Sequence, residues 1–344
     1  MTLLSVLDQS PIRSDATPAD AIADTLVLAE LADRLGYHRY WLAEHHSSGG
    51  LAGASPEILI AQVAQRTTGL RVGSGGVMLS HYSPLKVAES FRMLETLFPG
   101  RIDLGIGRAP GSDQVTDQAL QAGPGAVGPQ HYPMQVRDLI GYLDETLPDD
   151  HPFAQVRAMP AGPSAPPVWL LGSTDQSASL AAYFGCPFSF AQFIAGDDGT
   201  DAMEAYRQNF RPSERFPEPQ ASIGVFVICA DSDEAAERLM MSRDLSSVRQ
   251  RTGRPGPVPS YEEASAYVYS PQEEALRQYN RKRCIWGTAQ QVHDGLTAVA
   301  ASYDVDELVL LTICPTFEAR CRSYELLADA FGLTASDPRQ AAAS

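Results

Sequence analysis

The sequence has few lysines, no long apolar run and no obvious export signal. Lysine occurs only as Lys86 and Lys282, and the formal net charge of the 344 residues is −16. Such an acidic surface repels nucleic acid and anionic membranes, so we expect neither as a partner. No uninterrupted apolar run approaches the roughly 18 residues that a membrane span needs. Because the first residues lack a basic segment, we also expect no signal peptide.

Paired cysteines and a dinucleotide fingerprint are also missing. The five cysteines are scattered, odd in number and form no C-x-x-C pair; they are Cys186, Cys229, Cys284, Cys314 and Cys321. This pattern indicates reduced thiols in a cytoplasmic protein. No G-x-G-x-x-G opens the first helical segment, which disfavours an open dinucleotide-binding sheet.

The chain instead contains short apolar runs that alternate with longer amphipathic segments. Eight runs have the length and composition of strands, and each is followed by a helical segment; they are residues 3–7, 40–43, 70–79, 101–107, 168–171, 188–191, 223–229 and 307–311. This alternation predicts an α/β fold with a parallel sheet and crossover helices. Eight repeats in a chain of this size favour closure into a (β/α)8 TIM barrel.

Two long segments, 109–130 and 251–285, interrupt the alternation, and we interpret them as insertions after strands four and seven. We expect residues 1–335 to form one domain and residues 336–344 to form a disordered C-terminal tail. The second insertion contains four tyrosines and the run Arg281-Lys282-Arg283. It fits either a lid that excludes water or a solvated loop.

Two histidines follow the second predicted strand, in the run Glu44-His45-His46. In a (β/α)8 barrel the active site is built from the strand ends and the loops after them. Imidazole can donate or accept a proton near neutral pH. Alternate strand residues face opposite sides, so one histidine can face a pocket while its neighbour packs elsewhere. A pair of polar rim residues is the plainer interpretation, and a metal site would need further ligands that the spacing does not provide.

A candidate phosphate site lies at the ends of strands four and five. Arg108 ends strand four, and residues 172–177 (Gly-Ser-Thr-Asp-Gln-Ser) open the next helix. A guanidinium and a helix N-terminus both attract phosphate. A rim salt bridge and ordinary capping by Ser173 or Thr174 are the alternatives. Because strands four and five are adjacent, both groups can reach one anion, which an acidic chain could otherwise not hold.

Glycine is concentrated in the third predicted strand, at Gly73, Gly75 and Gly76. Glycine within a strand marks either a bulge or the close approach of a ligand. A flat aromatic ring could lie against such a backbone, but a bulge alone explains the pattern equally well. The apolar stripe on the following helix, which includes Met93 and Leu97, is interpreted as core.

In order and spacing, these segments resemble the luciferase-like flavin monooxygenases. The likeness covers nearly the whole chain, and its clearest pieces are residues 36–46, 71–79, 99–108, 169–173 and 306–308. The resemblance implies a (β/α)8 barrel that uses reduced FMN and O2. A flavin C4a-hydroperoxide would then oxygenate a small organic substrate.

The resemblance also assigns roles to individual residues. His45 matches the catalytic histidine of the family. Gly75 and Gly76 match a dipeptide beside the isoalloxazine ring that often carries a non-prolyl cis bond. The residues that match the FMN phosphate site are Arg108, Gly172, Ser173 and Ser177.

Two departures from the family pattern limit what the resemblance implies. Ser80 stands where relatives usually have proline, and Gly107 stands where light-emitting members carry a reactive cysteine. We therefore do not expect light emission. A separate NAD(P)H-flavin reductase and a homodimer, formed through the helices after strands two and three, are expected partners. The alternatives are an F420-dependent oxidoreductase on the same fold, a non-catalytic flavin-binding protein and a metal-dependent hydrolase using His45 and His46.

Overall fold

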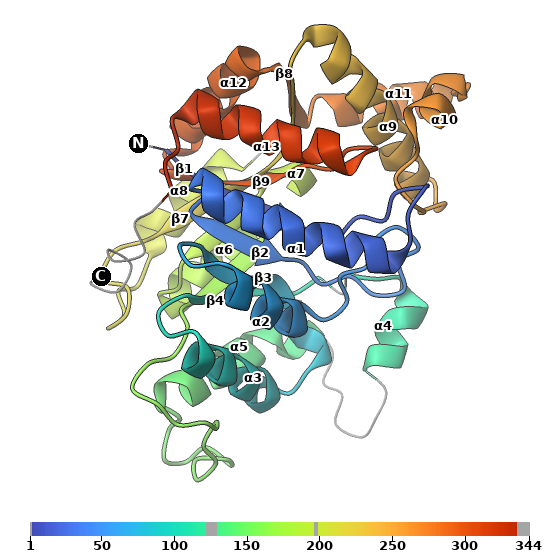
Figure 1. The fold of residues 1–344 in the computed structure, drawn as a ribbon. Helices are drawn as coiled ribbons and strands as arrows, with labels where there is room; N and C mark the ends of the chain where they lie inside the picture. The colour runs from blue at the N-terminus through green and yellow to red at the C-terminus, as the bar shows by residue number, and fades with distance from the viewer. Residues whose placement is uncertain (1, 110, 122–128, 196–198, 336–344) are drawn as a thin grey trace.

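The computed structural model describes residues 2–109, 111–121, 129–195 and 199–335. Eight parallel strands close into a barrel with helices around it (Figure 1), which confirms the predicted fold. The strand order is β6-β5-β4-β3-β2-β1-β9-β7, and β7 also pairs with β6 to close the ring. These strands are β1 (Leu3–Asp8), β2 (Arg39–Leu42), β3 (Arg71–Met78), β4 (Ile102–Gly107), β5 (Val168–Gly172), β6 (Phe188–Ala191), β7 (Ala221–Ala230) and β9 (Glu307–Leu311).

The helices follow the predicted alternation, and several end at the residues that the sequence indicates. α1 begins after the N-cap Thr17 and ends at Gly36, which is left-handed. α5 ends at Asp144, because Glu145 adopts φ 56° and stops it. The helices of the barrel are α1 (Pro18–Leu35), α2 (Pro56–Arg66), α3 (Pro84–Leu97), α5 (Tyr132–Asp144), α6 (Asp175–Phe184), α7 (Gln192–Ala195), α8 (Thr200–Asn209), α9 (Asp233–Arg251), α12 (Ala289–Tyr303) and α13 (Phe317–Phe331).

Both insertions contain more regular structure than expected. The first includes α4 (Gln114–Leu120), and the second includes α10 (Tyr261–Ala266), α11 (Pro271–Arg281) and a ninth strand, β8 (Cys284–Thr288). β8 pairs in parallel with the last five residues of β7, beyond the part of β7 that belongs to the barrel. In Figure 1, α4, α10 and α11 lie on the right of the molecule. Residues 110 and 122–128 of the first insertion and the expected tail, 336–344, lie outside the described residues, and the domain boundary at 335 stays a prediction.

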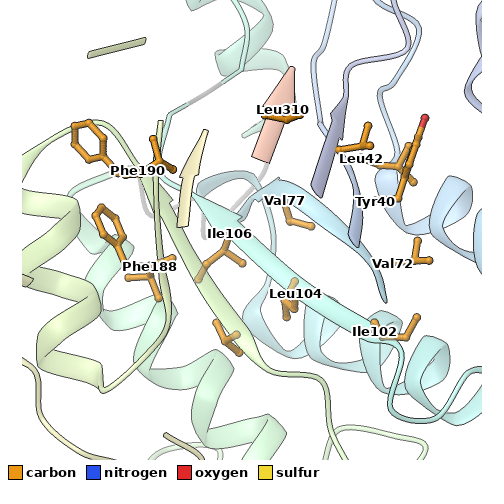
Figure 2. Close-up of a cluster of buried hydrophobic side chains, with 14 of the residues drawn as sticks. Tyr40, Leu42, Val72, Val77, Ile102, Leu104, Ile106, Phe188, Phe190 and Leu310 are labelled. Carbon is orange, nitrogen blue, oxygen red and sulfur yellow. The ribbon is translucent and has the colours of Figure 1, made fainter. Parts of the chain in front are cut away.

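Strand side chains alternate between an outer core and the barrel interior. Figure 2 shows the outer set on neighbouring strands, including Leu104 and Ile106 of β4 and Val77 of β3, all buried. The inner set forms a separate cluster in the middle of the barrel; its buried members are Leu7, Trp41, Ala43, Trp169 and Val309. His45 lies two positions beyond Ala43 of this inner set. Its side chain therefore lies on the inner side, at the barrel mouth.

A bulge in β3 interrupts the alternation. Ser74 pairs with Leu104 and Val77 with Ile106, so Gly75 and Gly76 together oppose one residue of β4. The extra residue returns Val77 to the outer core. The bulge that the glycines could indicate is therefore present.

Buried ion pairs fill the end of the barrel where the strands begin. Arg39 donates to Glu307 at 2.6 Å and to Asp103 at 2.8 Å, and its guanidinium lies 4.6 Å from the centroid of the Trp169 ring. Arg71 pairs with the second Asp103 oxygen at 2.5 Å. Burial alone would raise the pKa of Asp103, but the charges of Arg39 and Arg71 outweigh it and hold that pKa below 3.8.

Three sequence expectations about surface and thiols have clear outcomes. None of the five cysteines forms a disulfide, as predicted. Met93 and Leu97 of α3, assigned to the core, are 50% and 58% exposed, so that assignment was wrong. No helix in the described ranges combines the length and the apolar character that crossing a bilayer requires.

Candidate active site

His45 lies just beyond the end of β2 and faces the barrel mouth. Its backbone N–H donates to the Gly53 carbonyl at 2.9 Å, and its Nδ1 is buried with no hydrogen-bond partner among the described residues. Burial, together with the neighbouring His46, lowers the pKa of His45 to about 4. The imidazole is therefore neutral at pH 7, and one ring nitrogen is available for a ligand.

His46 belongs to a different network from His45. Its Nε2 lies 2.6 Å from the buried Glu44 carboxylate. The same carboxylate accepts hydrogen bonds from Tyr82 Oη at 2.7 Å and from the Met78 backbone N–H at 3.0 Å. Burial and the Glu44 carboxylate raise the pKa of Tyr82, so the phenol stays a donor. The two histidines therefore have different surroundings, and no group of metal-ligand side chains was found within the described residues.

The glycine pair lies on the next strand, beside His45. The peptide bond between Gly75 and Gly76 is cis, as the resemblance implied. A Cβ atom on Gly76 would lie 2.8 Å from the Gly105 carbonyl oxygen, and one on Gly75 would lie 2.6 Å from Leu7 Cδ1. Neither position has room for a side chain, so close packing is sufficient to require glycine here.

Arg108 follows β4 and reaches the start of α6. The exposed guanidinium donates a hydrogen bond to the side-chain oxygen of Gln176 in the first turn of that helix. Ser173 lies half-buried in the turn between β5 and α6. The arginine and the helix N-terminus, predicted to reach one anion, therefore lie side by side.

The turn between β5 and α6 is shaped by its own capping interactions. Thr174 is the N-cap, and its hydroxyl accepts a hydrogen bond from the Ser177 N–H at 3.3 Å. The two hydroxyl groups lie 3.1 Å apart. A Cβ atom on Gly172 would lie 2.2 Å from Ser177 Oγ, so glycine allows the serine to pack on the strand end. Capping by Thr174, one of the sequence alternatives, is thus present, and the first backbone donors of the helix remain exposed.

A cavity of about 520 Å³ opens beside His45. One wall is apolar and includes Phe193, Phe226 and Leu311. The second insertion forms another wall, and Val258 in it exchanges backbone hydrogen bonds with residues 12 and 14 after β1. The cavity lining includes His45 but none of the other candidate residues, which follow one another along the rim on β3, β4 and β5.

Sequence reasoning missed three polar residues of this site. Arg243 on α9 and Asn280 on α11 line the cavity, and Glu44 holds the end of β2. A signal for Arg243 was present, because Ala236, Met240 and Arg243 follow one another at helical spacing on the buried face of α9. Asn280 carried no such signal, since its position depends on how the insertion folds.

The family model described as luciferase-like monooxygenase matches residues 2–305. The uncharacterized protein YwcH of Bacillus subtilis is 46% identical, over 96% of this chain and 99% of its own length. The N-acetyl-S-alkylcysteine monooxygenase of the same organism is 37% identical, over 96% and 98%. The oxygenase component of a flavin-dependent trigonelline monooxygenase of Acinetobacter baylyi is 25% identical, over 85% and 84%.

Solved structures show the same fold. The crystal structure of apo-MsnO8 superposes with a TM-score of 0.88 at 39% identity, over 97% of this chain and 98% of that one. The oxygenating constituent of 3,6-diketocamphane monooxygenase from Pseudomonas putida, in complex with FMN, gives 0.70 at 18% identity, over 96% and 97%. An F420-dependent secondary alcohol dehydrogenase gives 0.70 at 13% identity, over 98% and 99%. The last two likenesses concern the fold alone.

Proposed function

Because the chain belongs to the luciferase-like monooxygenase family, we propose that it is the oxygenase component of a two-component FMN monooxygenase. A separate NAD(P)H-flavin reductase would supply reduced FMN, and O2 would be the second cosubstrate for oxygenation of a small organic substrate. The observation that carries this proposal is the order of groups along the rim. The anion-binding residues on β4 and β5, the glycine pair on β3 and His45 on β2 follow one another on adjacent strands.

The described residues fit FMN at this rim. Arg108 and the exposed N-terminus of α6, with Gly172, Ser173 and Ser177, would hold the phosphate. Gly75 and Gly76 lie on β3 between this cluster and His45, and the partly exposed backbone at Gly75 is where the flat ring would lie. When bound in reduced form, FMN supplies the two electrons that let O2 oxygenate an organic molecule.

His45 would act on the oxygen that reacts at the mouth. Its imidazole is neutral, faces the cavity and has an unpaired buried nitrogen, so it can hold or donate a proton at a ligand oxygen. The cavity is large enough for a small substrate next to it. The second insertion covers this side of the mouth, which supports its interpretation as a water-excluding lid.

Binding of the flavin can be tested by anaerobic titration of the protein with reduced FMN. We expect Arg108→Met to weaken binding about 10- to 100-fold, because hydrogen bonds to charged groups contribute about 1.5–3 kcal/mol. Arg137→Met is the matched control, since Arg137 bonds Asp138 on the surface of α5. On admission of air, the wild-type protein should slow the release of hydrogen peroxide relative to free reduced FMN. His45→Gln should lose this effect while it binds reduced FMN normally.

Two results would contradict the proposal. If reduced F420 binds and reduced FMN does not, the chain is a hydride-transfer enzyme on the same fold. If His45→Gln slows the release of hydrogen peroxide as much as the wild-type protein does, His45 has no chemical role. That result would favour a non-catalytic flavin-binding protein.

We further propose the homodimer that the resemblance implies. Ile58 on α2 and Leu97 on α3 are 64% and 58% exposed, and Met93 lies exposed on the same helix as Leu97. These are the helices after strands two and three, so their exposed apolar side chains support an interface there.

A further inference from the structure

The cavity beside His45 has a basic lining in a strongly acidic protein. Arg243, Arg251 and Arg283 line it, and none of the described lining residues is Asp or Glu. The whole chain has 42 acidic against 26 basic residues, so a lining with only positive charges reverses the overall balance. Such a local reversal favours an anionic ligand.

Arg243 is the residue that points most directly to a ligand. Its side chain is only 9% exposed, yet its Nε and Nη1 find no hydrogen-bond partner among the residues described. Its guanidinium lies 4.6 Å from the centroid of the Phe226 ring, which helps to fix its position. The adjacent Asp244 bonds Arg281 at 2.6 Å and not Arg243. A buried guanidinium without acceptors is costly unless a ligand supplies them.

Asn280 adds a second unsatisfied donor to the same lining. It is 3% exposed, and its Nδ2 has no acceptor within the described part of the chain. An amide and a guanidinium both donate hydrogen bonds, and together they require an acceptor group with several lone pairs. A carboxylate provides two oxygens with about four lone-pair sites.

The remainder of the cavity suits an apolar body attached to this anion. Phe193, Phe226 and Leu311 supply apolar surface, and His45 belongs to the same lining. A molecule bound by its carboxylate at Arg243 would therefore extend along apolar side chains toward the imidazole.

We propose that Arg243 and Asn280 bind the carboxylate of a small organic acid, and that this acid is the substrate class of the enzyme. The identification of the ligand as substrate rests on the proposed function, whereas the binding itself does not. Arg243 would position the substrate, and His45 would meet its reacting end.

The test uses a carboxylate and its uncharged counterpart, measured by calorimetry on the purified chain without flavin or O2. The probes are N-acetyl-S-methyl-L-cysteine and its primary amide. We expect the wild-type protein to prefer the acid about 10- to 100-fold, and Arg243→Met and Asn280→Leu to lose most of that preference. The control is Arg249→Met, on the same helix, because Arg249 pairs with Glu263 at 2.7 Å and does not line the cavity. Thermal melting of each variant checks that it is folded.

Several outcomes would overturn the inference. The inference fails if the acid and the amide bind equally, or if Arg243→Met keeps the full preference for the acid. It also fails if neither this acid nor benzoate, a second carboxylate probe, shows saturable binding. If Arg243→Met instead weakens reduced FMN as much as Arg108→Met does, the basic lining serves the flavin phosphate. Binding of the acid by a protein that does not bind reduced FMN would support this site while contradicting the proposed function.

Discussion

The two ends of the barrel hold buried charge in opposite ways. Where the strands begin, Arg39 is buried and pairs with both Asp103 and Glu307. At the mouth, where the strands end, His45 and Arg243 have buried nitrogen atoms without a hydrogen-bond partner in the described ranges. Both ends bury polar groups, but of the groups compared only His45 and Arg243, at the mouth, have nitrogen atoms without a partner among the described residues.

This difference separates stability from binding. A buried donor without an acceptor costs about 1–3 kcal/mol, which a bound ligand can recover. The unsatisfied donors at the mouth therefore favour ligand binding there, whereas the paired network at the other end favours a role in holding the barrel together. The comparison predicts that substitutions at the two ends will affect different measurements.

The largest effect is expected from Arg39→Met at the strand-start end. The substitution leaves Glu307 and Asp103 buried with fewer partners, and breaking a buried ion pair costs about 3–5 kcal/mol. Urea unfolding of the variant should show this loss. Arg243→Met, the matched change at the mouth, should alter stability by less than about 1 kcal/mol, because its nitrogens have few contacts to lose.

A stability loss in Arg243→Met equal to that in Arg39→Met would contradict the proposed difference between the two ends. It would show that Arg243 has a structural partner and is not held for a ligand. Retained stability in Arg39→Met would show that the paired network contributes little.

A smaller effect is expected from acid, and it also distinguishes the two ends. The pKa of His45 is lowered from 6.5 to about 4 on folding, so the folded state binds fewer protons than the unfolded state between these values. The stability from the neutral imidazole is complete above pH 6.5 and falls as the pH drops toward 4, by at most about 3 kcal/mol. Asp103, whose pKa is lowered, should lose its contribution only below pH 3.8.

Urea unfolding of the wild type and His45→Gln across pH 4–7 measures the first window. The difference in unfolding free energy between the two proteins should change with pH in this range and be constant above it. A constant difference throughout would mean that His45 is solvated and not buried at the mouth.

The sequence predicted the barrel well because its strands follow a simple rule. All eight barrel strands are short apolar runs between helices, and each can be recognised locally. β8 was missed because Cys284–Thr288 straddles the end of the second insertion and pairs with the far half of β7, a contact that no local pattern encodes.

The candidate site was predictable for the same reason, but only in part. His45, the glycine pair and Arg108 lie at strand ends, which a (β/α)8 barrel always brings to one face. Arg243 lies on α9 at the helical spacing of its buried face, so its position had a local signal, whereas Asn280 on α11 reaches the cavity only through the path of the second insertion. That path depends on contacts such as the hydrogen bonds of Val258 to the segment after β1, which the sequence does not reveal.

A smaller loss than at Arg39 is expected at Glu44, which lies at the mouth but has bonded partners for its carboxylate. Its carboxylate accepts from Met78 N–H and Tyr82 and contacts His46. Glu44→Gln replaces one acceptor oxygen with a donor that faces other donors, so we expect a loss of about 1–2 kcal/mol in urea unfolding. Binding of reduced FMN should weaken less than in Arg108→Met. Glu44 bonds the Met78 backbone N–H, two residues after the glycine pair, and would affect the proposed flavin site only through that contact.

Tyr82→Phe is the matched variant, since it removes one donor and leaves the carboxylate charged. It should cost less than Glu44→Gln. If Glu44→Gln is as stable as the wild type but no longer binds reduced FMN, Glu44 belongs with the ligand-binding groups. If it loses stability as expected, then the partners of a buried charge, and not its end of the barrel, decide whether it serves the fold or the ligand.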